Sequence, residues 1–246
     1  MKKLKDMGVD DNTIVVFTTD NGTETFTWPD GGNTPFRGQK GTIFEGGFRV
    51  PALIRWPGKV PAGKVENGIV SGLDWFPTLV AAAGNPNVGD ELKKGKQMGD
   101  RTYKVYLDGY NQMEMITGKG PSARHEIFYF GESTLGAVRI DDYKYRFIDQ
   151  PGGWVGSKAT VDAPVLTNLR LDPFERLDYP LNGTLSGSQN YFTWFQYEFW
   201  RFVFVQQAVA KLAMTALEFP PMQKGSSFNL EAVKAKIEEA AKQHRQ

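Results

Sequence analysis

The chain has 246 residues, of which 40% are hydrophobic and 23% charged, as in an ordinary globular domain. Its 29 basic and 28 acidic residues leave a net charge of +1, so the charge balance gives no reason to expect nucleic acid or an anionic membrane as a partner. It contains no cysteine, which excludes disulfides and thiolate metal sites within the chain. No apolar run is long and uncharged enough to span a bilayer.

The first predicted elements are a short helix and a strand. Residues 2–7 form an amphipathic helical pattern, and Gly8 follows it as a C-terminal cap. Residues 13–19, TIVVFTT, are a continuous β-branched and aromatic run without alternation. Such a run is typical of a strand buried on both faces of a parallel sheet. Residues 20–41 are rich in Gly, Pro, Asn and Thr, so we expect a long irregular loop with a functional role.

The next part of the chain is predicted to hold a second strand and a helix. Residues 48–56, FRVPALIRW, have the composition of a strand. Residues 73–83, LDWFPTLVAAA, predict an amphipathic helix that Gly84 ends. Residues 85–125 are polar, and we expect them to be mostly loop.

A small antiparallel sheet is predicted next. Its strands are three short apolar runs at hairpin spacing, residues 126–130, 136–140 and 143–148. Asp141 and Asp142 fit a tight turn between the last two runs. Residues 150–190 are expected to be loop-rich.

The end of the chain is predicted to be helical. Residues 191–218 form one long aromatic-rich pattern, and residues 229–243 form a polar terminal helix. The aromatic side chains could form a platform for carbohydrate or membrane, but at this density in a helix they more often pack in a core. They are Tyr191, Phe192, Trp194, Phe195, Tyr197, Phe199, Trp200 and Phe202.

Asp20, Asn21 and Gly22 stand where the first predicted strand ends. In α/β sheets, ligands bind at the carboxyl ends of strands because the loops there converge. The Asp20 carboxylate and the Asn21 amide oxygen are hard donors that suit Ca²⁺ or Mg²⁺. The alternative is a simple turn, which is the commoner role of an Asn-Gly pair.

Lys40 lies in a stretch flanked by glycines, GQKGT. A lysine between glycines can approach an anion closely, with its ammonium as a point charge and backbone N–H groups nearby. The stretch is not a P-loop, because Gly41 intervenes between the lysine and the following Thr42. The alternative is an ordinary solvated lysine on a surface loop.

These segments together carry a resemblance to a known family. The motifs TDNG, PFRGQKGTIFEGGFRVP and WPG follow one another between residues 19 and 58. Their order and spacing resemble the second signature region of the type I sulfatases, the arylsulfatase family of the alkaline phosphatase superfamily. SGLDWFPTLVAAAG and RHEIFYF, with AVRIDDYKYRF after it, resemble later family segments, and the tail resembles that of bacterial arylsulfatases. The resemblance covers most of the chain and weakens around residues 86–120 and 150–165.

The resemblance implies an α/β fold in two parts. Residues 1–125 would be the C-terminal part of the alkaline-phosphatase-like sulfatase α/β domain. Residues 126–246 would be a C-terminal subdomain with a small antiparallel sheet and a long helix. Asp20 and Asn21 would be ligands of a divalent cation, calcium or alternatively magnesium. Lys40 would be the catalytic residue that contacts the sulfate and steadies the leaving oxygen.

The family resemblance also suggests supporting roles around Lys40. Gly41, Gly46 and Gly47 are expected to shape the loop backbone. Glu45 and Arg49 are expected to be structural, with a direct catalytic role for either as the alternative. A cation together with a fixed ammonium would stabilise the negative charge that builds on the oxygens of a sulfate ester during cleavage.

The nucleophile of the family is not in this sequence. Sulfatases carry a Cys or Ser in a C/S-x-P-x-R motif that is oxidised to formylglycine, whereas the nearest sequence here, PSAR at residues 121–124, has the wrong spacing. His125 is expected to be structural, and His244 lies in the polar tail. We therefore expect the nucleophile in a missing N-terminal segment and little activity from this chain alone.

The expected partners follow from this interpretation. They are a sulfate-ester substrate and either the missing N-terminal half of the sulfatase or a second copy, which would associate through an exposed sheet edge. Neither nucleic acid nor a membrane span is expected. A full-length family member would be periplasmic or secreted.

Two alternatives remain open at this stage. One is hydrolysis of phosphate or phosphonate esters by an enzyme of the same superfamily, and the other is an inactive binding fragment. Phe26 and Trp28, which lie between the metal ligands and Lys40, are candidates for the rim of the substrate pocket.

Overall fold

The computed structural model describes residues 1–25, 27, 32–132, 134–177 and 185–220, with side chains from residue 190 onward in the last range. Its helices are α1 (Lys2–Asp6), α2 (Glu45–Phe48), α3 (Trp75–Ala82), α4 (Val88–Lys94), α5 (Met113–Ile116), α6 (Leu185–Glu198) and α7 (Phe202–Glu218). Its strands are β1 (Val15–Thr18), β2 (Ala52–Arg55), β3 (Lys96–Met98), β4 (Arg101–Tyr103), β5 (Glu126–Gly131), β6 (Thr134–Ile140), β7 (Tyr143–Asp149) and β8 (Ala159–Asn168). Short 3-10 helices span Asp10–Asn12, Gly72–Asp74 and Phe199–Arg201. The fold is therefore mixed α/β, as expected.

The short helix at the start of the chain is confirmed. Helix α1 ends at Asp6, and Gly8 follows with φ of +68°, a conformation that glycine adopts without a steric cost. The amide of Val9 donates to the carbonyl of Leu4 at 3.1 Å, which closes the helix end in the manner of a Schellman cap.

The burial predicted for the first strand is wrong in this structure. Strand β1 pairs antiparallel with β2 in a two-stranded ribbon, with Phe17 opposite Leu53. These two side chains are 62% and 60% exposed. Among the described residues no further strand extends this ribbon, and the last two residues of β1, Phe17 and Thr18, are exposed. A continuous apolar run indicates a strand that is stable when both faces are buried, but the burial itself depends on other elements of the fold.

The predicted helix in the middle of the chain is confirmed, and the loop after it is more regular than expected. Helix α3 ends before Gly84, whose φ is +102°. The segment expected to be loop holds α4, α5 and the β3–β4 hairpin. Helix α4 carries acidic residues in its first turn and lysines in its last, which complements the helix dipole. That charge order is a signal in the sequence that would have predicted this helix.

The small antiparallel sheet is confirmed and has one strand more than predicted. It runs in the order β5-β6-β7-β8, with every neighbouring pair antiparallel. The turn between β6 and β7 consists of Asp141 and Asp142, as expected, and Asp141 has φ of +49°, which aspartate tolerates better than most residues. Strand β8 lies in the segment expected to be loop, and four of its first five residues are exposed.

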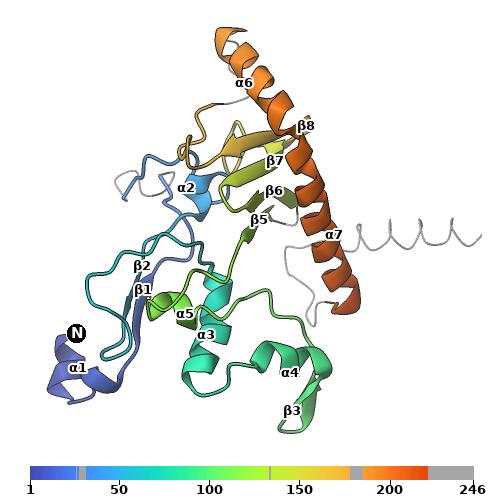
Figure 1. The fold of residues 1–246 in the computed structure, drawn as a ribbon. Helices are drawn as coiled ribbons and strands as arrows, with labels where there is room; N and C mark the ends of the chain where they lie inside the picture. Colours follow the sequence, from blue (N-terminus) through green and yellow to red (C-terminus); the bar gives the residue numbers. More distant parts are fainter. Residues whose placement is uncertain (26, 28–31, 133, 178–184, 221–246) are drawn as a thin grey trace, which may run out of the picture.

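Both faces of this sheet are covered by apolar contacts. On one face, Val138, Tyr145 and Leu166 form a cluster with Val205 of α7. On the other face, Tyr129, Ala137 and Ile148 pack with Ile43, which comes from the loop between β1 and β2. Figure 1 shows α7 running beside the sheet while the segment around α2 lies at its other side. The sheet therefore fixes the segment that precedes α2.

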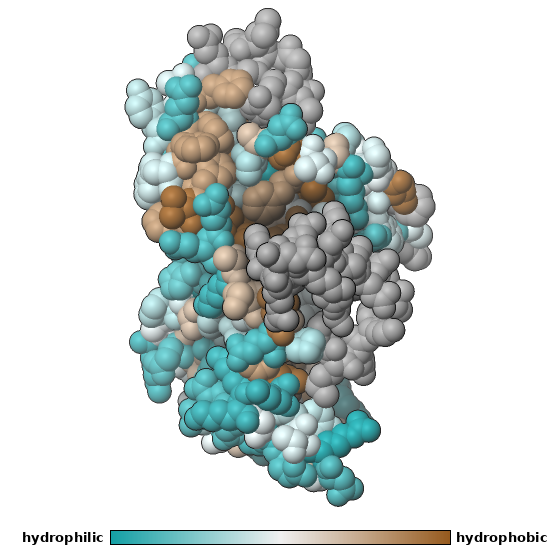
Figure 2. Space-filling view, turned by 90° about the vertical axis from the view of Figure 1, so that its right-hand side faces the viewer, coloured by the Kyte–Doolittle hydropathy of each residue, from teal (hydrophilic) through white to brown (hydrophobic). Residues whose placement is uncertain are grey.

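The aromatic-rich segment behaves only partly as predicted. It is two helices, because a 3-10 turn at Phe199–Arg201 separates α6 from α7. Tyr191, Trp194 and Phe195 are packed against the sheet cluster or against one another. Five other aromatic side chains of this segment are exposed: Phe192, Tyr197, Phe199, Trp200 and Phe204. Figure 2 shows apolar surface on the face of the molecule where these helices lie.

None of the helices in the described part of the chain is both long enough and apolar enough to cross a bilayer. The terminal helix predicted at residues 229–243, the candidate rim residues Phe26 and Trp28, and His244 all lie outside the described residues.

Candidate functional site

The candidate metal ligands lie just beyond the end of β1. Asp20 is exposed and Asn21 is half-buried. The Asp20 carboxylate accepts a hydrogen bond from the amide of Asn21 at 3.1 Å, and the Thr19 hydroxyl donates to the carbonyl of Asn21 at 3.1 Å. Both candidate ligands line an open groove whose other walls include parts of β2, α3, β5 and α7. The local turn thus presents two oxygen donors to an open surface.

Glycines bring this segment against the loop that carries Lys40. The amide of Gly22 donates to the carbonyl of Gly47 at 2.9 Å, and the amide of Gly46 donates to the carbonyl of Arg37 at 2.6 Å. A Cβ on Gly22 would lie 1.7 Å from the carbonyl oxygen of Gly46. Two backbones can approach this closely only without side chains between them. The expected role of Gly46 and Gly47 in shaping the loop is confirmed.

Lys40 is held beside the residues that follow Asn21. Its amide donates to the carbonyl of Thr23 at 2.9 Å, and its Nζ lies 3.2 Å from Oε2 of Glu24. Lys40 is not among the residues that line the groove of Asp20 and Asn21. The structure therefore ties the lysine to the same short segment as the two oxygen donors without a direct contact between them.

Glu24 is a residue that the sequence did not single out. A hydrogen bond from Thr27 and another from Lys40 lower the pKa of its carboxyl. It is therefore ionised at neutral pH and balances the charge of Lys40. The two residues are separated by 16 positions, a distance at which no helix or strand period pairs side chains.

Glu45 lies in a buried network of charges. Its carboxylate accepts hydrogen bonds from the Tyr129 hydroxyl at 2.7 Å, from Nζ of Lys144 at 3.1 Å and from Nε of Arg49 at 2.7 Å. Lys144 also lies 2.9 Å from Oε1 of Glu175. Burial alone would raise the pKa of Glu45, but the Lys144 ammonium and the hydrogen bonds from Arg49 and Tyr129 lower it to about 2. Glu45 thus anchors α2 to the antiparallel sheet, which agrees with the structural role expected for it and for Arg49.

A second buried network joins the 3-10 turn before α3 to the segment that leads into β5. Asp74 and Arg124 are 1% and 4% exposed, and their shortest contact, from Nη2 to Oδ1, is 2.6 Å. The Asp74 carboxylate also accepts from the amides of Ser71 at 2.9 Å and Tyr110 at 2.7 Å. Arg124 donates to the carbonyls of Asp108 and Glu126. Arg124 is the last residue of the PSAR sequence, and these buried contacts give it a role in supporting the fold.

His125 has a peripheral position. Its Nδ1 lies 2.7 Å from Oδ1 of Asp141, and the two side chains are 69% and 63% exposed. Their backbones are also joined, because the amide of Asp141 donates to the carbonyl of His125 at 2.8 Å. The contact braces the turn between β6 and β7, as the structural role predicted for this histidine requires.

The oxygen donors of Asp20 and Asn21 are of the type that a hard divalent cation binds, but they are too few to hold one by themselves. A carboxylate and an amide oxygen are suitable ligands, but calcium takes six to eight oxygens. In the described ranges no group of three or more His, Cys, Asp or Glu side chains is gathered in a way that could hold a metal. These residues could therefore supply only part of a metal site.

Comparison with known proteins gives a consistent result. The sequence model described as Sulfatase matches residues 1–85. Human arylsulfatase A is 34% identical over 205 residues, which are 76% of this chain and 37% of that protein. Dog N-acetylgalactosamine-6-sulfatase is 34% identical over 161 residues, 65% of this chain and 28% of that protein. The chain therefore spans well under half the length of the curated relatives that it matches.

A solved structure agrees with the sequence matches. The crystal structure of the PsFucS1 sulfatase from Pseudoalteromonas sp. superposes with a TM-score of 0.71 at 27% sequence identity. The superposition covers 90% of this chain and 41% of that one. The arrangement of elements described above thus recurs within a larger protein.

Proposed function

Because the chain belongs to the sulfatase family, we propose that it forms one side of the active site of a sulfuric ester hydrolase. The reaction consumes water and a sulfate ester and releases an alcohol and sulfate. The observation that carries the proposal is the placement of Lys40 against Thr23 and Glu24, directly after the oxygen donors Asp20 and Asn21. Cleavage of a sulfate ester concentrates negative charge on oxygen atoms, and the Lys40 ammonium, held by Glu24, is the positively charged group on this side of the site.

Asp20 and Asn21 are proposed as two ligands of a divalent cation, calcium or alternatively magnesium. Their oxygens are hard donors and open onto the groove that they line. When bound, the cation would stabilise charge on the sulfate oxygens. The exposure of Asp20 is consistent with a site completed by further ligands from outside this chain.

Lys40 is proposed as the residue that binds the sulfate and steadies the leaving oxygen. An ammonium has three donors, and Glu24 takes one of them, which leaves two for substrate oxygens. The ion pair also fixes the direction of a flexible side chain before substrate arrives. A donor held in place in advance pays less reorganisation in the transition state.

The nucleophile is proposed to be a formylglycine in a polypeptide segment that this sequence does not include, because the sequence contains no C/S-x-P-x-R motif. We further propose that residues 1–125 belong to the catalytic α/β domain and residues 126–246 to a C-terminal subdomain. The contacts of Ile43 and Glu45 with the antiparallel sheet would then join the two parts.

The proposed partner is the N-terminal part of a sulfatase, with self-association of this chain as the competing outcome. Phe17 and Leu53 form an exposed apolar pair on the β1–β2 ribbon. Open strand edges and exposed apolar surface favour pairing with another chain. The partner would cover this ribbon and add strands to it.

A calcium titration of the chain tests the proposed ligands. We expect weak binding, with a dissociation constant on the order of 1 mM or higher, because two ligands are far fewer than calcium prefers. Nuclear magnetic resonance should show calcium-dependent shifts at the amides of residues 19–22. Asp20→Ala should remove these shifts, whereas Asp100→Ala, at an exposed aspartate in a loop, should leave them. Tight stoichiometric binding in calorimetry, or shifts that survive Asp20→Ala, would contradict the assignment.

A further inference from the structure

The loop between β7 and β8 is fastened to the turn that carries Lys40. Gln150, which is 2% exposed, holds two backbone groups of that turn with its side-chain amide. Its Oε1 accepts from the amide of Ile43 at 2.8 Å, and its Nε2 donates to the carbonyl of Gly41 at 3.1 Å. A buried amide that is satisfied on both sides sets the position of one loop relative to the other. The β7–β8 loop is therefore held close to Lys40.

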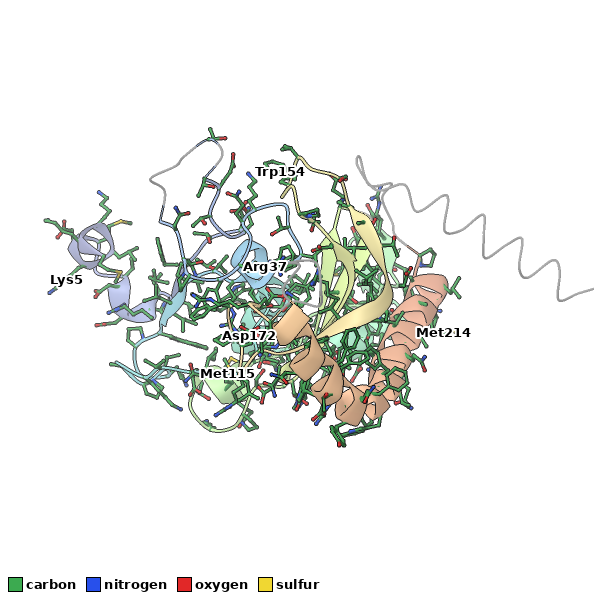
Figure 3. All side chains as sticks on the ribbon, turned by 90° about the horizontal axis from the view of Figure 1, so that it is seen from above. Lys5, Arg37, Met115, Trp154, Asp172 and Met214 are labelled. Carbon is green, nitrogen blue, oxygen red and sulfur yellow. The ribbon has the colours of Figure 1, made fainter. Side chains whose placement is uncertain are left out.

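Trp154 lies in this loop and covers the backbone next to Lys40. A Cβ on Gly41 would lie 2.1 Å from Cγ of Trp154, and Gly41 has φ of +78°. The indole thus packs directly on the glycine, in space that any other residue would fill. Nζ of Lys40 lies 5.1 Å from the centre of the indole, within the range of a cation–π contact. Figure 3 shows Trp154 on the loop at the edge of the molecule.

These contacts cover only part of the indole surface. Trp154 remains 40% exposed, although tryptophan is largely buried on average in folded proteins. The loop around it contains Gly152, Gly153 and Val155, and Val155 is 79% exposed. A wide aromatic surface is thus open to solvent beside a paired ammonium. Such an arrangement can take a ligand that is anionic at one end and carries a ring at the other.

We propose that Trp154 is a specificity-determining residue that stacks on the ring of the substrate's organic group, aryl or pyranose, while Lys40 holds the sulfate. This inference rests on the proposed function, because it takes Lys40 as the sulfate-binding residue. Stacking of the substrate's ring on the indole is expected to strengthen binding about tenfold, which corresponds to about 1.4 kcal/mol. The ring of the substrate therefore adds affinity that a small alkyl sulfate lacks.

The test is a titration of the whole chain with phenyl sulfate, glucose 6-sulfate, methyl sulfate and phenol, followed by nuclear magnetic resonance. The signals observed are the indole N–H of Trp154 and the amide of Lys40. Trp154→Ala should lower the affinity for phenyl sulfate about tenfold but the affinity for methyl sulfate by no more than about twofold. Trp154→Phe should retain most of the affinity for phenyl sulfate. Val155→Ala, the control in the same loop, should leave the affinities for phenyl sulfate and methyl sulfate unchanged. Weakening of glucose 6-sulfate by Trp154→Ala would extend the role to pyranose rings, and an unchanged affinity would restrict it to aryl rings.

Other results would each overturn the proposed role of Trp154. Equal weakening of phenyl sulfate and methyl sulfate by Trp154→Ala, or no weakening of either, would overturn the role of Trp154 while leaving Lys40 as the sulfate-binding residue. Phenol that shifts the Trp154 signal as strongly as phenyl sulfate would also overturn it, because binding would then be independent of the sulfate. If none of the three sulfate esters shifts the Lys40 signal in the unsubstituted chain, the proposed function fails and this inference fails with it.

Discussion

Replacing Asp74 with alanine is expected to lower the free energy of unfolding by about 3–5 kcal/mol, the cost typical of breaking a buried ion pair from one side. The change leaves the guanidinium of Arg124 buried without its carboxylate partner, and Arg124 is only 4% exposed. It also removes the acceptor for the amides of Ser71 and Tyr110. Urea denaturation of the chain, followed by circular dichroism, measures the effect.

Asp6→Ala is the matched control for this prediction. Asp6 lies 2.6 Å from Nζ of Lys2, the same distance as the shortest contact between Asp74 and Arg124, but its pair is exposed. Exposed ion pairs contribute little to stability, so we expect almost no change. The double variant Asp74→Ala/Arg124→Ala should lower the free energy of unfolding by less than the sum of the two single variants, because neither charge is then left unpaired. Similar effects at Asp74 and Asp6 would show that the buried pair does not hold the fold together.

Replacing Lys40 with alanine is expected to lower kcat/KM for an aryl sulfate by about 100- to 1,000-fold once the proposed N-terminal segment is supplied. The change removes the ammonium that is proposed to stabilise charge on the leaving oxygen. It also leaves Glu24 without its cation, which places an unpaired negative charge near the incoming sulfate. Steady-state hydrolysis of 4-nitrophenyl sulfate measures the loss.

Lys59→Ala is the control for the charge of the chain. Lys59 is an exposed lysine outside the candidate site, and its removal should leave kcat/KM unchanged. Lys40→Arg should recover part of the activity, because the positive charge returns with a different donor geometry. A Lys40→Ala protein with unchanged kcat/KM would remove Lys40 from the reaction.

Local patterns in the sequence predicted much of the fold. The hairpin spacing of β5, β6 and β7, the turn at Asp141 and the ends of α1 and α3 all depend on residues close together in the chain. The burial of β1 was predicted wrongly, because burial depends on which elements pack on the faces of a strand, and Phe17 of β1 is 62% exposed. Strand β8 was missed because half of it is exposed.

The contacts that assemble the candidate site lie beyond local patterns. Glu45 meets Lys144 across 99 positions, and its amide reaches Glu175 across 130. No sequence period connects residues so far apart, and the free energy of such contacts depends on burial that only the folded chain provides. Motif and strand end were enough to name Asp20, Asn21 and Lys40 as candidates. Glu24 and Trp154, which contact Lys40, became visible only in the structure.

The most direct test of the proposed function is the hydrolysis of 4-nitrophenyl sulfate and 4-nitrophenyl phosphate by this chain, assayed with and without the formylglycine-bearing N-terminal segment of a sulfatase. We expect turnover only when both polypeptides and calcium are present, with a strong preference for the sulfate ester. Preferential turnover of the phosphate ester would contradict the assignment of the reaction. No turnover of either ester by the combined polypeptides would leave a binding fragment as the better description of the chain.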